Sequence, residues 1–183
     1  MNKSIRMILT LVIIASISGI ILAEVYNLTE SEIKDKREKD LEEAIFSVIP
    51  QAKSYTTKDY NGLKIYECTD KDGRRCGICF TAEGVGYQDR IRIMIGLNKD
   101  LSEIEGIRIL EEQETPGLGG RINERWFQKQ FEGRPTDINL KVVSEKSGKI
   151  DEIQAITGAT ISSNAVVNIV NKKIEEVKRI INK

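Results

Sequence analysis

An uncharged apolar stretch near the N-terminus constrains the fold of this chain more than any other feature of its sequence. Residues 7–23 contain no charged side chain, and as a helix they would extend for about 26 Å at 1.5 Å per residue. This length is at the short end of a membrane span, and the Arg6 side chain can lengthen the span by reaching the lipid headgroups. We therefore expect residues 1–28 to form a membrane anchor in contact with lipid.

The charges on either side of this stretch predict its orientation. Lys3 and Arg6 precede the apolar residues, whereas Glu24 and Glu30 follow them. The positive-inside rule then places the N-terminus in the cytoplasm and the rest of the chain on the extracytoplasmic side of the cell (inner) membrane. A cleaved signal peptide is the alternative, but its apolar core is normally shorter, and residues 21–23 (Ile-Leu-Ala) make a poor cleavage site.

The charge balance and the absence of histidine exclude several functions. Lys plus Arg and Asp plus Glu both number 28, so no net charge recruits nucleic acid. The chain has no His, which excludes hydrolysis by a Ser/His pair and removes the commonest zinc ligand. Any chemistry must therefore come from other side chains or from a cofactor.

A charged, amphipathic segment follows the apolar stretch and predicts a second helix. Thr29 with Glu32 resembles a capping box, and Pro50 would end such a helix. Its apolar residues lie near one helical face: Ile33, Leu41, Ala44, Ile45 and Val48. We expect residues 29–50 to be an amphipathic helix that links the anchor to a domain formed by residues 51–183.

Alternating apolar residues predict strands between residues 54 and 110. In residues 90–97 the apolar side chains of Ile91, Ile93, Ile95 and Leu97 share one face, and turn sequences occur at residues 70–73 and 98–100. An antiparallel sheet with one buried face is expected. A short helix near residues 122–131, a strand at 140–143 and a long helix after residue 160 should follow. The predicted fold class is α+β, with an N-terminal transmembrane helix and helices flanking an antiparallel sheet.

The three cysteines leave two interpretations open. Cys76 and Cys79 form a CxxC motif, but a thioredoxin-like motif belongs at a helix N-terminus and this one lies in a predicted strand. Three cysteines without His are too few ligands for zinc or a four-thiolate iron–sulfur cluster, so we expect no metal. A structural disulfide is the simpler interpretation outside the cytoplasm, with Cys68 facing Cys76 across the 70–73 turn and Cys79 free.

The sequence Thr157-Gly158-Ala159-Thr160 lies where the long C-terminal helix is predicted to begin. The free N–H groups and the dipole of a helix N-terminus attract phosphate. Gly158 lets the backbone approach a ligand closely, and Ala159 adds no bulk. The alternative is that a hydroxyl of this region only caps the helix, as Ser and Thr commonly do.

A second glycine-rich motif, residues 114–120 (Glu-Thr-Pro-Gly-Leu-Gly-Gly), lies between a predicted strand and a predicted helix. Three glycines, a carboxylate and a hydroxyl within seven residues exceed what a simple turn needs. Loops of this kind bring backbone N–H groups against a planar or anionic ligand. The motif therefore predicts a second part of a ligand site.

Together, the anchor, the small outward domain and the two motifs in this order resemble the FMN-binding G subunit of the Rnf electron-transport complex. The resemblance covers nearly the whole chain. It implies FMN attached by a phosphoester bond to Thr160, and other membrane subunits of the Rnf complex as partners. It places the following residues near the cofactor: Thr157, Gly158, Ala159, Glu114, Thr115, Gly117, Leu118 and Gly119.

The same resemblance implies a flavin-attaching transferase as a further partner. An Asp often stands six residues before the modified Thr in this family, but Gln154 occupies that position here. The chain would be part of a redox-driven ion translocase, without complete turnover of its own. The C subunit of the Na⁺-translocating NADH:quinone reductase shares the attachment motif. That protein, an exported non-redox binding domain and a thiol–disulfide protein are the alternatives.

Overall fold

The computed structural model describes residues 3–60 and 62–181, and the chain divides into two compact units, Met1–Asp40 and Leu41–Lys183. Most of the first unit is one helix, α1 (Lys3–Val48), which continues into the second. Its segment Lys3–Glu30 is long and apolar enough to cross a membrane, judged by length and composition. None of that segment's most apolar window is buried by protein, as a lipid-facing helix requires.

The predicted start of a separate helix at Thr29 is wrong. The backbone is already helical there, and the Thr29 hydroxyl donates hydrogen bonds to the carbonyl groups of Val25 (2.8 Å) and Tyr26 (3.2 Å) in the preceding turn. A hydroxyl used in this way supports a helix interior and does not cap a new helix. The predicted end is confirmed, because α1 ends at Val48, before Pro50.

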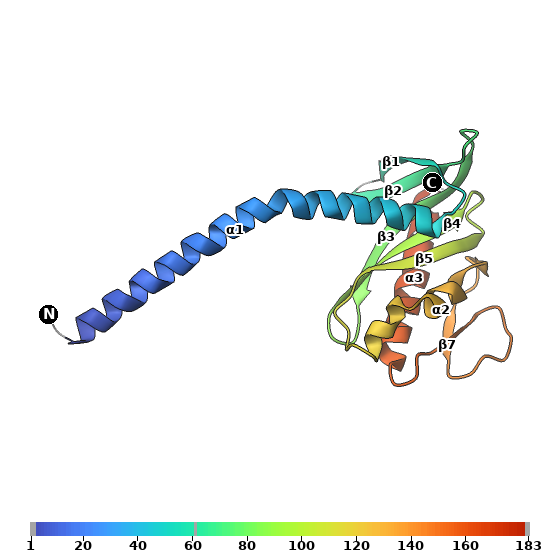
Figure 1. Ribbon diagram of the computed structural model, residues 1–183. Coiled ribbons are helices and arrows are strands. Elements are labelled where there is room, and N and C mark those ends of the chain that lie inside the picture. The colour runs from blue at the N-terminus through green and yellow to red at the C-terminus, as the bar shows by residue number, and fades with distance from the viewer. Residues whose placement is uncertain (1–2, 61, 182–183) are drawn as a thin grey trace. The chain divides into compact units, whose positions relative to one another are not determined.

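A six-stranded antiparallel sheet, in the order β1-β2-β3-β4-β5-β6, forms the centre of the second unit (Figure 1). The predicted strands and turns of this sheet are confirmed, and within it the short β6 was not expected. At the first turn, Asp70 Oδ1 accepts hydrogen bonds from the N–H groups of Asp72 and Arg74. The strands are β1 (Ser54–Tyr60), β2 (Leu63–Thr69), β3 (Arg75–Val85), β4 (Arg90–Asn98), β5 (Glu103–Glu111) and β6 (Arg134–Pro135).

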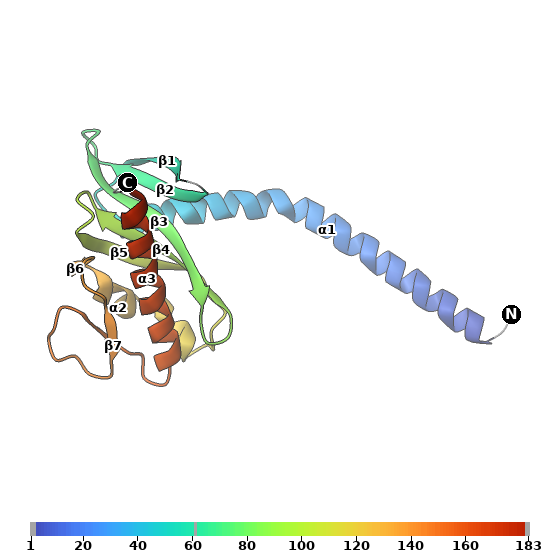
Figure 2. The same ribbon diagram turned by 180° about the vertical axis from the view of Figure 1, so that it is seen from behind.

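The long helix α3 (Thr160–Ile181) packs across one face of this sheet (Figure 2). Its apolar residues have the predicted helical spacing, and Val166, Val170 and Val177 are fully buried. The chain between β5 and α3 forms η1 (Gly119–Asn123), α2 (Arg125–Gln128), η2 (Lys129–Phe131), β7 (Lys141–Val143) and β8 (Glu152–Gln154). β7 and β8 pair in parallel, and β8 was not predicted.

The prediction of only one buried face is wrong. On the other face, apolar residues of the end of α1 (Ala44 to Val48) and the following Ile49 pack over Met94 and the neighbouring strands. Glycines in the sheet permit this close approach: a Cβ atom at Gly96 would lie 3.0 Å from the carbonyl oxygen of Val48, and one at Gly106 would lie 3.3 Å from it. The end of α1 therefore packs directly against the backbone of the sheet at these glycines.

The predicted proximity of Cys68 to Cys76 is also wrong. Cys68 lies opposite Gly77, and a register shift beside it displaces Cys76. The buried sulfur neighbours are Cys68 and Cys79, with the two Sγ atoms 3.6 Å apart, and all three cysteines are free thiols. The hydrogen bond with Cys68 and burial raise the pKa of the Cys79 thiol, which opposes the reactive thiolate of a thiol–disulfide enzyme.

Candidate functional site

Three segments distant in sequence meet at the start of α3. They are the hairpin turn between β3 and β4 (residues 85–90), the glycine-rich loop after β5 (residues 112–120) and the turn that leads into α3 (residues 156–163). Both sequence motifs lie in these segments, so the structure brings them together. The hairpin turn was not predicted as part of the site.

A single buried carboxylate joins the three segments. Glu114 is only 5% exposed. Its Oε1 accepts hydrogen bonds from the backbone N–H groups of Tyr87 (2.8 Å) and Gln88 (3.1 Å), and its Oε2 accepts one from the Ser162 hydroxyl (2.5 Å). We call these four residues the Glu114 bridge. Hydrogen bonds to a charged acceptor are the stronger ones in proteins, so the bridge fixes the hairpin turn and the helix start to the loop.

Two glycines allow the bridge to close. A Cβ atom at Gly119 would lie 2.6 Å from Ser162 Oγ and 2.7 Å from Glu114 Oε2, and one at Gly86 would collide with Glu114 Oε1. Real Cβ atoms essentially never approach other atoms so closely. Gly86 and Gly119 are therefore required by the close contacts of the bridge.

The loop is held by short-range hydrogen bonds and leaves one apolar side chain exposed. The Thr115 carbonyl accepts the N–H groups of Leu118 (3.1 Å) and Gly120 (3.0 Å), and Gly117 adopts a positive φ of 77°. The Gln88 side-chain amide donates to the Thr115 hydroxyl at 2.6 Å. Leu118 is 46% exposed, which gives the loop an apolar tip.

The turn before α3 presents Thr160 to solvent. Gly158 has a φ of 79°, and a Cβ atom there would lie 3.2 Å from Leu118 Cδ2, so the loop tip contacts this turn. Thr157, Gly158 and Thr160 are exposed, whereas Ala159 is buried. A positive φ with little free space explains why glycine occupies position 158.

Three hydroxyl groups lie in the first turn of α3, and they have different environments. Ser162 is buried and donates to Glu114. Ser163 is buried, accepts the N–H of Ile156 (3.0 Å) and donates to the carbonyl of Ala159 (2.9 Å). The Thr160 hydroxyl is exposed and has no hydrogen-bond partner within residues 3–60 and 62–181. It is therefore the hydroxyl of this turn that is accessible for modification.

The helix start also has free donors. Among the described residues, no acceptor is found for the backbone N–H groups of residues 160–162. Ala159 precedes the helix and has no polar side chain to cap it. Unsatisfied N–H groups at a helix N-terminus suit a phosphate, and the Thr160 side chain does not take that role itself.

Exposed apolar side chains surround this turn. Tyr87 on the hairpin turn is 63% exposed, and Ile161 is 59% exposed. With Leu118 they provide an apolar surface beside a turn whose backbone N–H groups are free, an arrangement that suits a ligand with a planar ring and a phosphate, such as FMN. The signal that could have revealed the hairpin turn is its composition, since Tyr87, an aromatic residue, directly follows Gly86 between two predicted strands.

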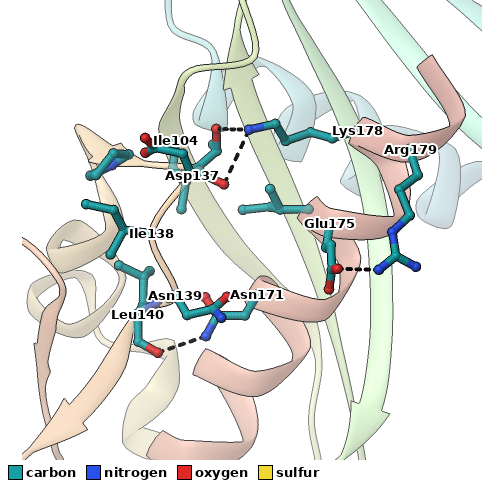
Figure 3. Close-up of a pocket in the computed structure, with 12 residues that line it drawn as sticks. Ile104, Asp137, Ile138, Asn139, Leu140, Asn171, Glu175, Lys178 and Arg179 are labelled. Carbon is teal, nitrogen blue, oxygen red and sulfur yellow. Dashed lines mark hydrogen bonds and ion pairs between the residues drawn. The ribbon is translucent and has the colours of Figure 1, made fainter. Parts of the chain in front are cut away.

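A separate cavity lies at the other end of α3. It has a volume of about 490 Å³, and its lining includes Asp137, Asn139, Lys178 and Arg179 (Figure 3). Here the Asn171 side chain accepts the N–H of Leu140 at 3.1 Å and donates to its carbonyl at 2.8 Å. None of the predicted site residues lines this cavity.

Comparisons with known proteins agree with a flavin site. The family model of the FMN-binding domain matches residues 86–175, a range that includes the hairpin turn from Gly86, the glycine-rich loop and the start of α3. The second unit therefore contains an FMN-binding domain.

Relatives of known complexes match almost the whole chain. The chain is 32% identical to the G subunit of the ion-translocating oxidoreductase complex of Methanosarcina acetivorans, over 94% of this chain and 93% of the relative. It is also 32% identical to the G subunit of the proton-translocating ferredoxin:NAD(+) oxidoreductase complex of Clostridium ljungdahlii, over 91% and 88%. The chain belongs to this family of G subunits, and it is a membrane protein and a flavoprotein component of a redox enzyme complex.

Solved structures support the fold. The C subunit of the Na⁺-translocating NADH:quinone reductase from Parabacteroides distasonis aligns with a TM-score of 0.62 and 17% identity, over 81% of this chain and 96% of that chain. NqrC of Shewanella oneidensis aligns with a TM-score of 0.56 and 19% identity, over 69% and 67%. The α+β fold with an antiparallel sheet is therefore confirmed.

Proposed function

We propose that this chain is the membrane-anchored flavoprotein of an ion-translocating ferredoxin:NAD⁺ oxidoreductase (Rnf) complex and relays electrons through FMN attached covalently to Thr160. Residues 1–28 anchor it, and residues 51–183 bind the flavin on the extracytoplasmic side. Other membrane subunits of the complex supply and remove the electrons. The relatives' names and the FMN-binding domain support the role in the complex.

The observation that carries the attachment site is the environment of the Thr160 hydroxyl. It is the exposed and unpartnered hydroxyl in the first turn of α3 among the described residues, beside free backbone N–H groups, while Ser162 and Ser163 are buried and engaged. The exposed neighbours Leu118 and Ile161 offer an apolar surface to the ring. Within the loop, Thr115, Gly117 and Gly119 shape the backbone on which the ring rests.

Attachment requires a flavin whose phosphate carries a leaving group. Direct condensation of FMN with a hydroxyl would have to release water into water, whereas a flavin dinucleotide can transfer its FMN phosphoryl group. The Thr160 oxygen then forms the new P–O bond, the pyrophosphate bond breaks, the hydroxyl proton is lost, and the mononucleotide AMP leaves. A separate transferase performs this step and must recognise the exposed residues before Thr160, where Gln154 lies at the end of β8.

A covalent bond solves a retention problem. A dissociation constant of 1 μM corresponds to about 8 kcal/mol, and the helix dipole contributes roughly 0.3–2 kcal/mol, so non-covalent FMN would be lost outside the cell. When bound, FMN supplies the redox chemistry through its isoalloxazine ring. The chain's own residues hold the phosphate at the helix start and the ring against the apolar surface.

One experiment tests the attachment. The full chain is produced with and without a flavin transferase, denatured, and examined for fluorescence that stays with the polypeptide. Thr160→Val should abolish this fluorescence, whereas Thr57→Val, the same change at an exposed threonine of β1 outside the three segments of the site, should retain it. Flavin retained by Thr160→Val would refute the site, and a chain without flavin in any variant would favour a non-redox binding domain.

A further inference from the structure

The Glu114 carboxylate is already occupied by hydrogen bonds to the protein. Both of its oxygen atoms accept hydrogen bonds from protein groups, three in all, and the side chain is almost completely buried. A carboxylate with these contacts is poorly placed to touch the flavin. Its partners, however, lie on all three segments of the site.

We infer that Glu114 is a positioning residue, which holds the first turn of α3 in the orientation that presents the Thr160 hydroxyl for flavin transfer. The inference rests on the proposed function, because it concerns the same attachment step. Glu114 acts through its hydrogen bonds to Ser162 and to the hairpin turn, and it makes no contact with the cofactor.

Helix geometry connects Ser162 to Thr160. Two residues along an α-helix are separated by about 200° of rotation, so a turn that directs Ser162 inward toward Glu114 directs Thr160 outward to solvent. The two residues have these environments: Ser162 is buried and Thr160 exposed. Fixing the one side chain therefore fixes the direction of the other.

Few hydrogen bonds restrain the residues before Ser163 in the first turn of α3. The N–H groups of residues 160–162 have no acceptor among the described residues, as is usual at a helix start. Helix ends fray when such groups are not satisfied. The hydrogen bond from Ser162 to the buried carboxylate therefore restrains the turn, together with the Ser163 contacts.

Two substitutions at the same position separate geometry from charge. In Glu114→Gln, the amide oxygen can accept both backbone N–H groups, and the amide nitrogen can donate to the Ser162 hydroxyl, which then accepts. In Glu114→Ala all three contacts are lost. A positioning role predicts that glutamine restores what alanine removes, although glutamine has no charge.

The experiment measures transfer of flavin from flavin adenine dinucleotide to the purified full-length chain by a purified flavin transferase. The initial rate is measured against chain concentration to give kcat and KM. A misplacement of reacting groups by about 1 Å costs on the order of 100-fold, so for Glu114→Ala we expect kcat/KM to fall by about tenfold or more. Glu114→Gln should remain within about threefold of the wild type.

A matched control tests whether a general loss of stability explains the lower kcat/KM of Glu114→Ala. Asn171→Ala removes two hydrogen bonds to Leu140 at the middle of the same helix, about three turns after Thr160; Figure 3 shows the contact with the Leu140 carbonyl. It should lower the melting temperature and leave kcat/KM for flavin transfer unchanged. This pattern would separate positioning from folding.

The outcomes are distinct. Equal kcat/KM for Glu114→Ala, Asn171→Ala and the wild type would overturn the inference, and so would equal losses in Glu114→Ala and Glu114→Gln, because these would indicate charge. Failure of the wild type to accept flavin, or acceptance by Thr160→Val, would instead refute the proposed function. A lower kcat/KM in Glu114→Ala, together with a kcat/KM near that of the wild type in Glu114→Gln, would support the positioning role.

Discussion

Adding one methyl group at Gly119 tests the packing of the Glu114 bridge. In Gly119→Ala the new Cβ atom would lie 2.6 Å from Ser162 Oγ and 2.7 Å from Glu114 Oε2. Both atoms belong to buried side chains that are hydrogen bonded to each other. The new atom would also lie 2.9 Å from Glu114 Cβ, which cannot turn away because it is bonded directly to the backbone. Overpacking costs about 1–3 kcal/mol, and a hydrogen bond to a charged group contributes about 1.5–3 kcal/mol.

We therefore expect Gly119→Ala to lower the free energy of unfolding by about 2.5–6 kcal/mol, the sum of the two costs. A loss of about 3 kcal/mol would lower the melting temperature of a domain of this size by roughly 6–12 °C. The measurement is guanidinium unfolding of the flavin-free full chain in detergent, followed by the fluorescence of Trp126, the single tryptophan.

The neighbouring glycine provides a matched control. A Cβ atom at Gly120 would make only ordinary contacts, the nearest at 3.5 Å from the Thr115 carbonyl oxygen. Gly120→Ala should therefore leave stability within about 0.5 kcal/mol of the wild type. Equal stability of the two variants would refute the reasoning, because it would show that no tight contact surrounds Gly119.

Two further predictions concern other parts of the domain. Gly96→Val should lower the free energy of unfolding by about 1–3 kcal/mol in the same assay, because its side chain would meet the Val48 carbonyl of α1; an unchanged value would contradict that packing. The hydrogen bond from Lys141 holds the pKa of Asp151 below its ordinary value. A lowered pKa contributes stability at a pH above the unfolded value, and that contribution is lost as the pH falls through the folded value. Lys141→Met should therefore raise the pKa of Asp151 in an NMR titration and lose stability at neutral pH but not in acid; an unshifted pKa would exclude the ion pair.

Local patterns predicted much of the fold. Alternation in residues 90–97 indicated β4, helical spacing after residue 160 indicated α3, and the turn composition of residues 70–73 indicated the hairpin turn that Asp70 closes. The second buried face was not predicted, because glycines and not apolar side chains form part of it. Glycine ordinarily weakens a strand, and only the approach of Val48 explains Gly96 and Gly106.

The site could be predicted only where its residues lie in contiguous motifs. A contiguous motif contains Thr160, and the second motif contains Glu114, so both positions were found in the sequence. The contacts of Glu114 were not, because Tyr87 and Ser162 are separated from it by 27 and 48 residues. Hydrogen bonds across such separations leave no periodic pattern. The cysteine pairing failed because a register shift in β2 and β3 cannot be read from spacing.

The most direct test of the account is the mass of one peptide from the protein in its native membrane. Cleavage after Lys149 and Lys172 releases residues 150–172, which include Thr160. The account predicts that this peptide is heavier by one FMN less one water, with fragmentation placing the addition on Thr160. An unmodified peptide, or an addition on Thr157, Ser162 or Ser163, would contradict it.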